Sequence, residues 1–397
     1  MKIGVFPFAS SLHDSNWVKK EGQKFLDEIS SRVGLTLSFV EKEQLDSMDF
    51  TISFIQTGGV ENKFLEMLPS LKEPYLLLTY GEHNSLAASM EILSYLKDEG
   101  KQGEILHGSL DYIAKKLKEI VLVHEAKKKL QNVKLGVIGK PSDWLIGSHV
   151  KDEDAKKLYG IQLVHLSIDE LYQKFMQEDA SFCPSKKEWK FDEEELNLSK
   201  RMYLALEDMV KQYQLSGLTL RCFDLLTMAH TTGCLGLALL NDKGCIGTCE
   251  GDVPTMITMQ ILYHLIGCPG FQANPSRIDL EKKEMIFAHC TLPFSMTETH
   301  TLDTHFESGI GVAVRGEMHL GTITIFKLSK DLRHYYVDTA ELVENLHESN
   351  LCRTQIRLRF DHDLSYFLTR PYGNHHVILY GDHCSLIRAF MENILSK

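Results

Sequence analysis

Apolar runs of β type alternate with helical patterns in the first part of the chain, and this alternation constrains the fold more than any other feature. The β-type runs lie at 2–8, 35–40, 50–56 and 75–79, and a helical pattern at 18–32 separates the first two. Such alternation is typical of βαβ units, in which parallel strands form a sheet with helices on both faces. The sequence therefore predicts an α/β domain at the N-terminus.

The same pattern predicts a second α/β domain. A long helical stretch at 109–131 closes the first domain, and a new β-type run opens at 134–138. A helical pattern at 192–214 and a β-type run at 218–222 continue the alternation. We therefore place the first domain boundary near residue 133.

The sequence pattern changes near residue 285, where short β-type runs are separated by Gly, Asp and Asn. These runs lie at 285–290, 309–314, 320–328, 355–360, 366–369 and 376–380, before a final helical pattern at 385–395. Short runs of this kind favour an antiparallel sheet or barrel. The predicted architecture is two Rossmann-like α/β domains, 1–133 and 134–268, followed by a β-rich, barrel-like C-terminal domain, 269–397.

The composition limits the class of protein. With 397 residues, of which 43% are hydrophobic, the chain is long enough for two or three domains with apolar cores. The net charge of -11 and the lack of a concentrated Lys/Arg stripe argue against a nucleic-acid partner. No run approaches the roughly 20 apolar residues of a membrane span.

We expect a cytoplasmic protein. The sequence begins with a short apolar strand that runs directly into polar residues, without the charged leader and long apolar region of a signal peptide. Nine cysteines, an odd number spread through apolar segments, fit reduced core thiols better than a disulfide framework.

Three polar residues predict a metal site. The segment 247–255, Gly-Thr-Cys-Glu-Gly-Asp-Val-Pro-Thr, places Glu250 in a glycine-flanked turn just before an uncharged helical run. His289 and His376 lie in later β-type runs, and only folding can bring the three together. One carboxylate with two imidazoles and open water positions suits Mn²⁺ or a similar divalent ion. Each residue also has a structural explanation, since Glu250 or Asp252 can cap the following helix and a lone histidine is usually a hydrogen-bonded core side chain.

Strand alternation separates the adjacent histidines His375 and His376. Neighbouring side chains of a strand point to opposite faces, so if one binds a metal ion the other stacks or hydrogen-bonds behind it. We expect His376 to be the ligand. The same rule turns Cys249 and Cys290 away from their neighbours and argues against a cysteine-rich zinc site.

Several motifs occur in an order that resembles a known superfamily. They are Gly-Lys-Pro-Ser-Asp-Trp-Leu-Ile at 139–146, Cys-Glu-Gly-Asp at 249–252, Phe-Ala-His-Cys-Thr-Leu-Pro at 287–293, Thr-His-Phe-Glu-Ser-Gly at 304–309 and Gly-Asn-His-His-Val at 373–377. Together they resemble the L-fucose isomerase and L-arabinose isomerase superfamily, in particular its fucose isomerase-like branch. The resemblance covers most of the chain and implies a metal site between the second and third domains.

The resemblance also implies an activity, which is aldose–ketose isomerisation of a monosaccharide with Mn²⁺. In that family the ion binds the sugar O1 and O2, and carboxylates carry a proton between C1 and C2 through an ene-diol, whose developing charge a cation stabilises. By motif position Glu250 is both ligand and acid/base, and His289 and His376 are ligands. A homo-oligomer, trimer or hexamer, is implied as well, with Asn84 and Ser85 of a neighbouring subunit facing the substrate.

The chain departs from the family at the second carboxylate. Where active members carry Asp or Glu, this chain has Ala273 or Asn274. Asn274 can coordinate an ion through its amide oxygen, but at neutral pH it cannot accept and return a proton. Candidate replacements are Asp252, Asp279 and Glu307, and we favour Glu307 because Gly309 near it allows close approach of a ligand. Solvated turn carboxylates are the alternative for Asp279 and Glu307.

Asp143 and Trp144 are predicted to contact the sugar. A loop after the strand at 134–138 would offer an aromatic face and a carboxylate, although a helix cap followed by a core tryptophan fits the same residues. Two other functions compete with the isomerase. One is a degenerate family member that binds a sugar or metal without turnover, which the change at 273–274 supports. The other is a two-lobed periplasmic sugar-binding protein, which the additional β-rich domain argues against.

Overall fold

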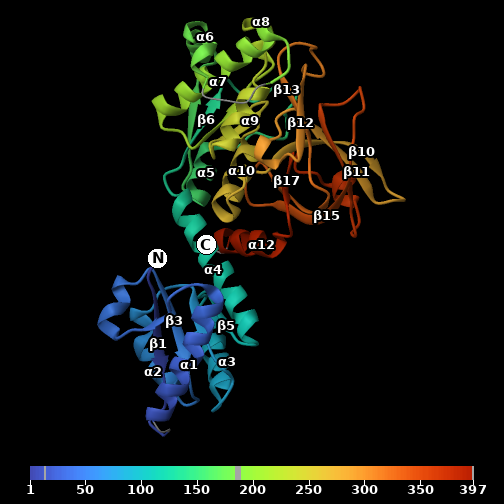
Figure 1. Ribbon diagram of the computed structural model, residues 1–397. Coiled ribbons are helices and arrows are strands. Elements are labelled where there is room, and N and C mark those ends of the chain that lie inside the picture. The colour runs from blue at the N-terminus through green and yellow to red at the C-terminus, as the bar shows by residue number, and fades with distance from the viewer. Residues whose placement is uncertain (13–14, 184–188, 396–397) are drawn as a thin grey trace. The chain divides into compact units, whose positions relative to one another are not determined.

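The chain forms two compact units, Met1–Leu122 and Val123–Lys397. The computed structural model describes residues 1–12, 15–183 and 189–395 (Figure 1). It confirms the predicted fold class, because two parallel sheets with helices precede a closed antiparallel barrel. Within the described ranges, no helix is both long and apolar enough to cross a membrane.

The first unit is an α/β domain on a five-stranded parallel sheet with the order β2-β1-β3-β4-β5. Its strands are β1 (Ile3–Phe8), β2 (Ser38–Phe39), β3 (Phe50–Ile55), β4 (Tyr75–Leu78) and β5 (Gly103–Leu106). Its helices are α1 (Ser15–Val33), α2 (Glu61–Met67), α3 (Ser85–Asp98) and the first part of α4 (Leu110–Leu130), which continues into the second unit, with 3-10 turns at Lys42–Ser47 and Leu68–Ser70. β2 is shorter than the run predicted at 35–40.

Helices on both faces explain why the central strands are buried without alternation. All residues of β3 and β4 are buried. Ile52 and Phe54 pack in one core with residues of α1 and α4, whereas Ile55 packs in another core with residues of α2 and α3. The sheet thus separates two cores.

The second unit begins with a four-stranded parallel sheet with the order β7-β6-β8-β9. Its strands are β6 (Lys134–Ile138), β7 (Gln162–Leu166), β8 (Gly217–Leu220) and β9 (Ile246–Cys249). The helices are α5 (Asp152–Tyr159), α6 (Ile168–Gln177), α7 (Glu193–Tyr213), α8 (Asp224–Met228), α9 (Cys234–Asp242) and α10 (Val253–Ile266), with a 3-10 turn at Ala180–Phe182. The loops after β6, β8 and β9 meet at the carboxyl edge of this sheet.

The barrel follows, closed in the order β10-β11-β16-β15-β14-β17, with every pairing antiparallel. Its strands are β10 (Phe271–Asp279), β11 (Glu284–His289), β14 (Gly321–Leu328), β15 (Tyr335–Asn345), β16 (Thr354–Arg359) and β17 (His376–Tyr380). A separate two-stranded sheet pairs β12 (Thr299–Asp303) with β13 (Ala313–Glu317). The remaining elements are a 3-10 turn at Phe294–Met296, α11 (Ser365–Thr369) and α12 (Cys384–Leu395).

The run at 366–369 was predicted to be a strand and is helix α11 instead. Its one buried side chain, Phe367, contacts the rings of Phe287 and Phe360, while Leu368 is exposed. The sequence of a short aromatic run does not distinguish a strand that pairs in a sheet from a helical turn that packs one side chain onto the barrel.

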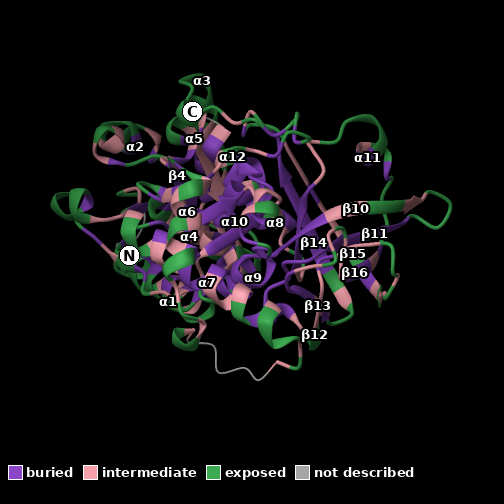
Figure 2. Cartoon of the chain, turned by 90° about the horizontal axis from the view of Figure 1, so that it is seen from above, coloured by how far each residue is buried: buried purple, intermediate pink, exposed green. Residues whose placement is uncertain are grey.

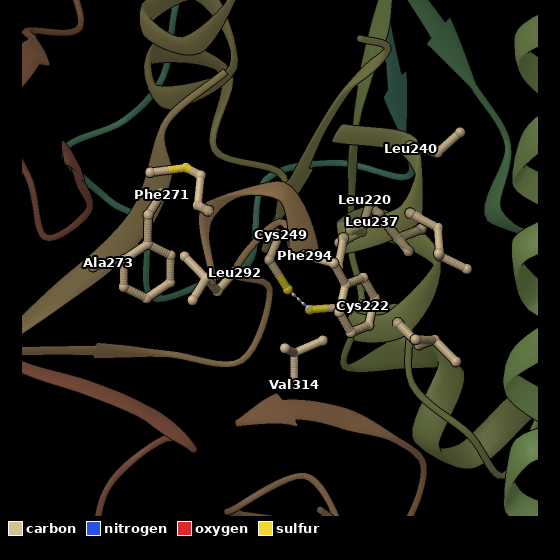
Figure 3. Packing of buried hydrophobic residues seen from close by; sticks show 14 of the residues in the cluster. Leu220, Cys222, Leu237, Leu240, Cys249, Phe271, Ala273, Leu292, Phe294 and Val314 are labelled. Carbon is tan, nitrogen blue, oxygen red and sulfur yellow. Dashed lines mark hydrogen bonds between the residues drawn. The ribbon is translucent and has the colours of Figure 1, made fainter. Parts of the chain in front are cut away.

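The parallel sheet and the barrel share one hydrophobic core. Figure 3 shows Leu220 and Leu237 of the sheet region in the same cluster as Phe271 and Leu292 of the barrel region. Helix α10 packs against β8 and β9 on one side and against β14 and β17 on the other. It is therefore buried nearly all round, as its uncharged sequence requires (Figure 2). The predicted boundary at residue 268 separates two sheets but not two cores.

Leu358 provides a test of the barrel core. Its side chain is fully buried, and it pairs in register with Met285 and Leu342. Replacing Leu358 with Ala is expected to lower the free energy of unfolding by about 2–5 kcal/mol, because a cavity remains. The matched control is Leu320→Ala at a residue that is 62% exposed, with an expected change within about 0.5 kcal/mol. Urea unfolding followed by circular dichroism measures both, and equal effects would contradict the burial of Leu358.

Candidate metal centre

A sharp turn between β9 and α10 sets the position of Glu250. Glu250 (φ 65°) and Gly251 (φ 73°) both have left-handed backbone conformations. A residue other than glycine pays free energy for this conformation, so surrounding contacts must hold Glu250 there. Asp252 then caps α10, since its Oδ1 accepts a hydrogen bond of 2.9 Å from the Thr255 backbone amide.

The loop after β6 packs on this turn. A Cβ on Gly251 would lie 2.7 Å from the Cα of Pro141, so only glycine fits without displacing the loop. The Ser142 amide donates a hydrogen bond of 2.9 Å to the carbonyl oxygen of Glu250. From the loop after β8, Arg221 Nη1 donates to the Pro141 carbonyl oxygen at 2.8 Å. Three loops of neighbouring parallel strands thus meet at one edge, where ligands of such sheets commonly bind.

Glu250, His289 and His375 converge at this edge. One ligand atom from each lies within 4.8 Å of the other two, and all three residues are buried. The barrel supplies both imidazoles, because His289 ends β11 and His375 directly precedes β17. Among the residues that the structure describes, no other group of three or more His, Cys, Asp or Glu side chains has this geometry. We call these three residues the Glu-His-His group.

Hydrogen bonds orient both imidazoles. His375 Nδ1 donates to Asp252 Oδ2 at 2.8 Å. His289 Nδ1 shares a hydrogen bond of 3.1 Å with Thr291 Oγ1. In each ring the other nitrogen, Nε2, remains for a ligand, and a partner of this kind fixes the tautomer of a metal-binding histidine.

An unsatisfied nitrogen supports a cation at the Glu-His-His group. His375 Nε2 is buried and makes no hydrogen bond, although Glu250 Oε1 lies 3.4 Å away. A buried polar atom without a partner costs about 1–3 kcal/mol, which an ion between the two atoms would remove. A carboxylate oxygen with imidazole nitrogens suits divalent transition-metal ions. The residues present therefore fit such an ion.

The electrostatics favour one positive charge between two carboxylates. Burial by itself raises the pKa of Glu250, but the charges of His375 and His289 and hydrogen bonds outweigh it and lower this pKa to about 2. Burial lowers the pKa of His375, but Glu250 and Asp252 outweigh it and raise the pKa to about 9. Burial and His375 lower the pKa of His289 to about 4. At neutral pH the metal-free site thus holds two carboxylates, a protonated His375 and a neutral His289.

The structure reverses the predicted positions of the two adjacent histidines. His376, the expected ligand, is fully buried with its ring against Phe287, and its Nε2 shares a hydrogen bond of 3.1 Å with Tyr366 Oη. Its Nδ1 bonds a backbone carbonyl oxygen at 3.0 Å. His375, expected behind it, is the histidine beside Glu250. The alternation of side chains along a strand shows that His375 and His376 point to opposite faces. It does not show which of these faces lies beside Glu250 and His289.

Asn274 is not part of the Glu-His-His group. Its Oδ1 accepts a hydrogen bond of 3.2 Å from Asn374 Nδ2. Ala273 is fully buried and pairs with His376 across β10 and β17. Position 273–274 therefore offers an amide that is already bonded and an apolar side chain, with no group that transfers a proton at neutral pH.

Of the two predicted sugar contacts, Trp144 lies at the group and Asp143 turns away. Trp144 Nε1 donates to Glu250 Oε2 at 2.7 Å, and 52% of this residue stays exposed. Its ring meets Phe223 edge to face, with 4.8 Å between centroids. Asp143 instead accepts from Arg221 Nη2 at 2.8 Å, and this contact lowers the pKa of its carboxyl.

Four other predicted site residues lie outside the group. Glu307 is exposed in the loop between β12 and β13. Asp279 Oδ1 accepts from two backbone amides of the β10–β11 hairpin, each at 3.1 Å. Asn84 belongs to the first unit, where it precedes α3 with φ 59°. Asp252, considered as an acid/base, is fully buried and orients His375 instead.

Two supporting residues were not predicted from the sequence. Thr291 orients His289, and Lys327 lies 3.5 Å from Asp252 Oδ2. Thr291 carries no distinguishing signal. Lys327 does carry one, because it is a charged residue in the otherwise uncharged run Ile-Thr-Ile-Phe-Lys-Leu of β14.

Comparison with known proteins supports a sugar isomerase. No protein-family model matches the chain. The proteins named sulfoquinovose isomerase of Priestia megaterium (strain ATCC 12872 / QMB1551) and Priestia aryabhattai are each 22% identical over 391 residues, which cover 90% of this chain and 86% of each relative. A sulfoquinovose isomerase of Clostridium sp. (strain MSTE9) is 27% identical over 176 residues, 42% of this chain and 39% of that protein.

A substitution at Gly251 tests how closely the loop after β6 packs on the turn between β9 and α10. Gly251→Ala is expected to lower the free energy of unfolding by about 1–3 kcal/mol, because the new Cβ meets Pro141 and the left-handed backbone disfavours alanine. Gly147→Ala in the same loop is the control, since a Cβ there would meet nothing within 4 Å. Thermal and urea unfolding measure both variants. Equal stability of the two would show that the turn is not packed as described.

Proposed function

We propose that the protein is a metal-dependent aldose–ketose isomerase of a monosaccharide. The observation that carries this proposal is the Glu-His-His group, in which ligand atoms of Glu250, His289 and His375 lie within 4.8 Å of one another. The three relatives named sulfoquinovose isomerase support the reaction class. The motifs shared with fucose isomerase-like proteins support the same assignment.

Glu250 is suited to move the proton between C1 and C2. Its carboxylate is ionised at neutral pH and so has oxygens that can accept a proton, and Trp144 holds Oε2 in place while Oε1 faces His375. When bound, an ion such as Mn²⁺ supplies positive charge that polarises the oxygens of the sugar and stabilises the ene-diol. His289 and His375 would hold the ion together with Glu250.

An aromatic wall beside Glu250 is suited to the apolar face of a sugar ring. Trp144 contacts Phe223, and Phe223 meets His305 edge to face with 5.7 Å between centroids. Exposed aromatic rings commonly stack on sugars, and the exposed half of Trp144 is available for this. A homo-oligomer that adds Asn84 of a neighbouring subunit stays a prediction.

The second candidate function is binding without turnover. It is favoured by Asn274, whose amide bonds Asn374 and cannot replace the second carboxylate of the family. If catalysis needs two proton-transfer groups, the loss of one lowers the rate by about 10²–10⁴-fold.

Deuterium exchange separates the two functions. The protein with Mn²⁺ in deuterated water is expected to form ketose with deuterium at C1, and to return aldose with deuterium at C2, with at least one sugar of a panel that contains sulfoquinovose, deoxy aldoses and pentoses. Mass spectrometry and NMR detect both products. Metal binding without exchange in any sugar would overturn the isomerase and leave the binding function. Failure to bind any divalent ion would overturn both.

The choice between the two histidines can be tested by metal affinity. His375→Gln is expected to weaken Mn²⁺ binding by more than about 100-fold. Loss of a metal ligand should cost more affinity than a change in a residue that only hydrogen-bonds to a ligand, which typically costs about 10–100-fold. His376→Gln is the matched variant, since it makes the same substitution at the adjacent histidine, whose ring nitrogens bond Tyr366 and a backbone carbonyl instead of facing Glu250, and its affinity should stay within a few-fold of the original. Electron paramagnetic resonance measures free Mn²⁺, and circular dichroism verifies folding. Loss of affinity in the His376 variant alone would restore the sequence-based choice.

A further inference from the structure

A buried lysine lies behind the Glu-His-His group. Within the described part of the chain, Lys327 is the one lysine with its side chain fully buried. It lies on β14, where it pairs in register with Tyr336. An unpaired ammonium group in such surroundings would cost several kcal/mol, so its partners must compensate for the lost water.

Both polar partners of Lys327 belong to the first turn of α10. Lys327 Nζ donates to Thr255 Oγ1 at 2.9 Å and lies 3.5 Å from Asp252 Oδ2. Thr255 also donates its backbone amide to Asp252 Oδ1 at 2.9 Å. Lys327 therefore contacts the Asp252 carboxylate directly. It also contacts Thr255, whose backbone amide holds the other oxygen of that carboxylate.

Asp252 connects the lysine to the group. The oxygen that faces Lys327, Oδ2, is the same one that accepts from His375 Nδ1 at 2.8 Å. With both oxygens engaged, the carboxylate cannot rotate without breaking a contact. The imidazole of His375 is thereby held with Nε2 towards Glu250 Oε1, 3.4 Å away.

We infer that Lys327 is a positioning residue, which through Asp252 fixes the ring of His375 so that its Nε2 is presented to a metal ion beside Glu250. The inference rests on the proposed metal-dependent function. Without the ammonium group, Asp252 Oδ2 loses its contact with Lys327 and keeps that with His375, so the carboxylate and the ring that it orients are held less firmly and the ligand set is less preorganised.

The test compares Mn²⁺ affinity in four variants. Lys327→Met keeps an unbranched side chain one atom shorter and removes the charge, and it is expected to weaken Mn²⁺ binding by about 10–100-fold, the usual effect of changing a residue behind a metal ligand. Lys330→Met, at an exposed lysine three residues later, is the control and should bind as the unchanged protein does. Electron paramagnetic resonance measures the dissociation constants.

A double-mutant cycle shows whether the effect passes through Asp252. Asp252→Asn should weaken binding by itself, and adding Lys327→Met to it should weaken binding little further, because both changes break the same connection. Fully additive losses would mean that Lys327 acts by another route, for instance through general stability, and would overturn the inference. Thermal unfolding of each variant identifies losses that reflect folding alone.

The outcomes separate this inference from the proposed function. If the unchanged protein binds no Mn²⁺, the proposed function fails. If it binds Mn²⁺ and Lys327→Met binds equally well, the function stands and the inference about Lys327 is wrong. Should Lys327→Met not fold, Lys327→Gln answers the same question, because its side chain is polar but carries no charge.

Discussion

A line of buried, charged side chains holds the centre of the second unit together. Glu250, His375, Asp252 and Lys327 follow one another, with successive polar atoms 3.4, 2.8 and 3.5 Å apart. When His375 is protonated, negative and positive charges alternate along this line. Breaking one buried pair leaves a charge without compensation, which typically costs about 3–5 kcal/mol. The line joins the beginning of α10 to β14 and to the start of β17, so it fixes the parallel sheet against the barrel.

Helix α10 explains why the site lies where it does. The helix packs between two sheets, and most of its side chains are buried against them. The backbone amides of its first turn need acceptors, and Asp252 supplies one. The turn that precedes the helix then brings Glu250 beside the histidines of the barrel.

The Glu-His-His group has one carboxylate, whereas a proton shuttle of two carboxylates would need another beside the sugar. The amide at position 274 is bonded to Asn374, and the alanine before it belongs to the core. An aldose–ketose isomerase built on this site would rely on Glu250 for proton transfer and on a group other than Asn274 for the second step. The similarity to sulfoquinovose isomerases covers 90% of the chain, so it agrees with the architecture as a whole rather than with a single motif.

The sequence by itself determined the fold class, and it singled out Glu250 and His289 as candidate ligands. Periodicity is a local property, so the β-type runs at 50–56 and 75–79 already indicated a parallel sheet, and the glycine-flanked Glu250 and the strand-ending His289 stood out as candidates. Only the tertiary structure decided that His375 rather than His376 joins them, that Asp252 and Lys327 support that ring, and that 366–369 is helical. The physical reason is that the sequence shows only which side chains of a strand share a face. What each face packs against is set by contacts between segments a hundred or more residues apart, such as His375 with Asp252.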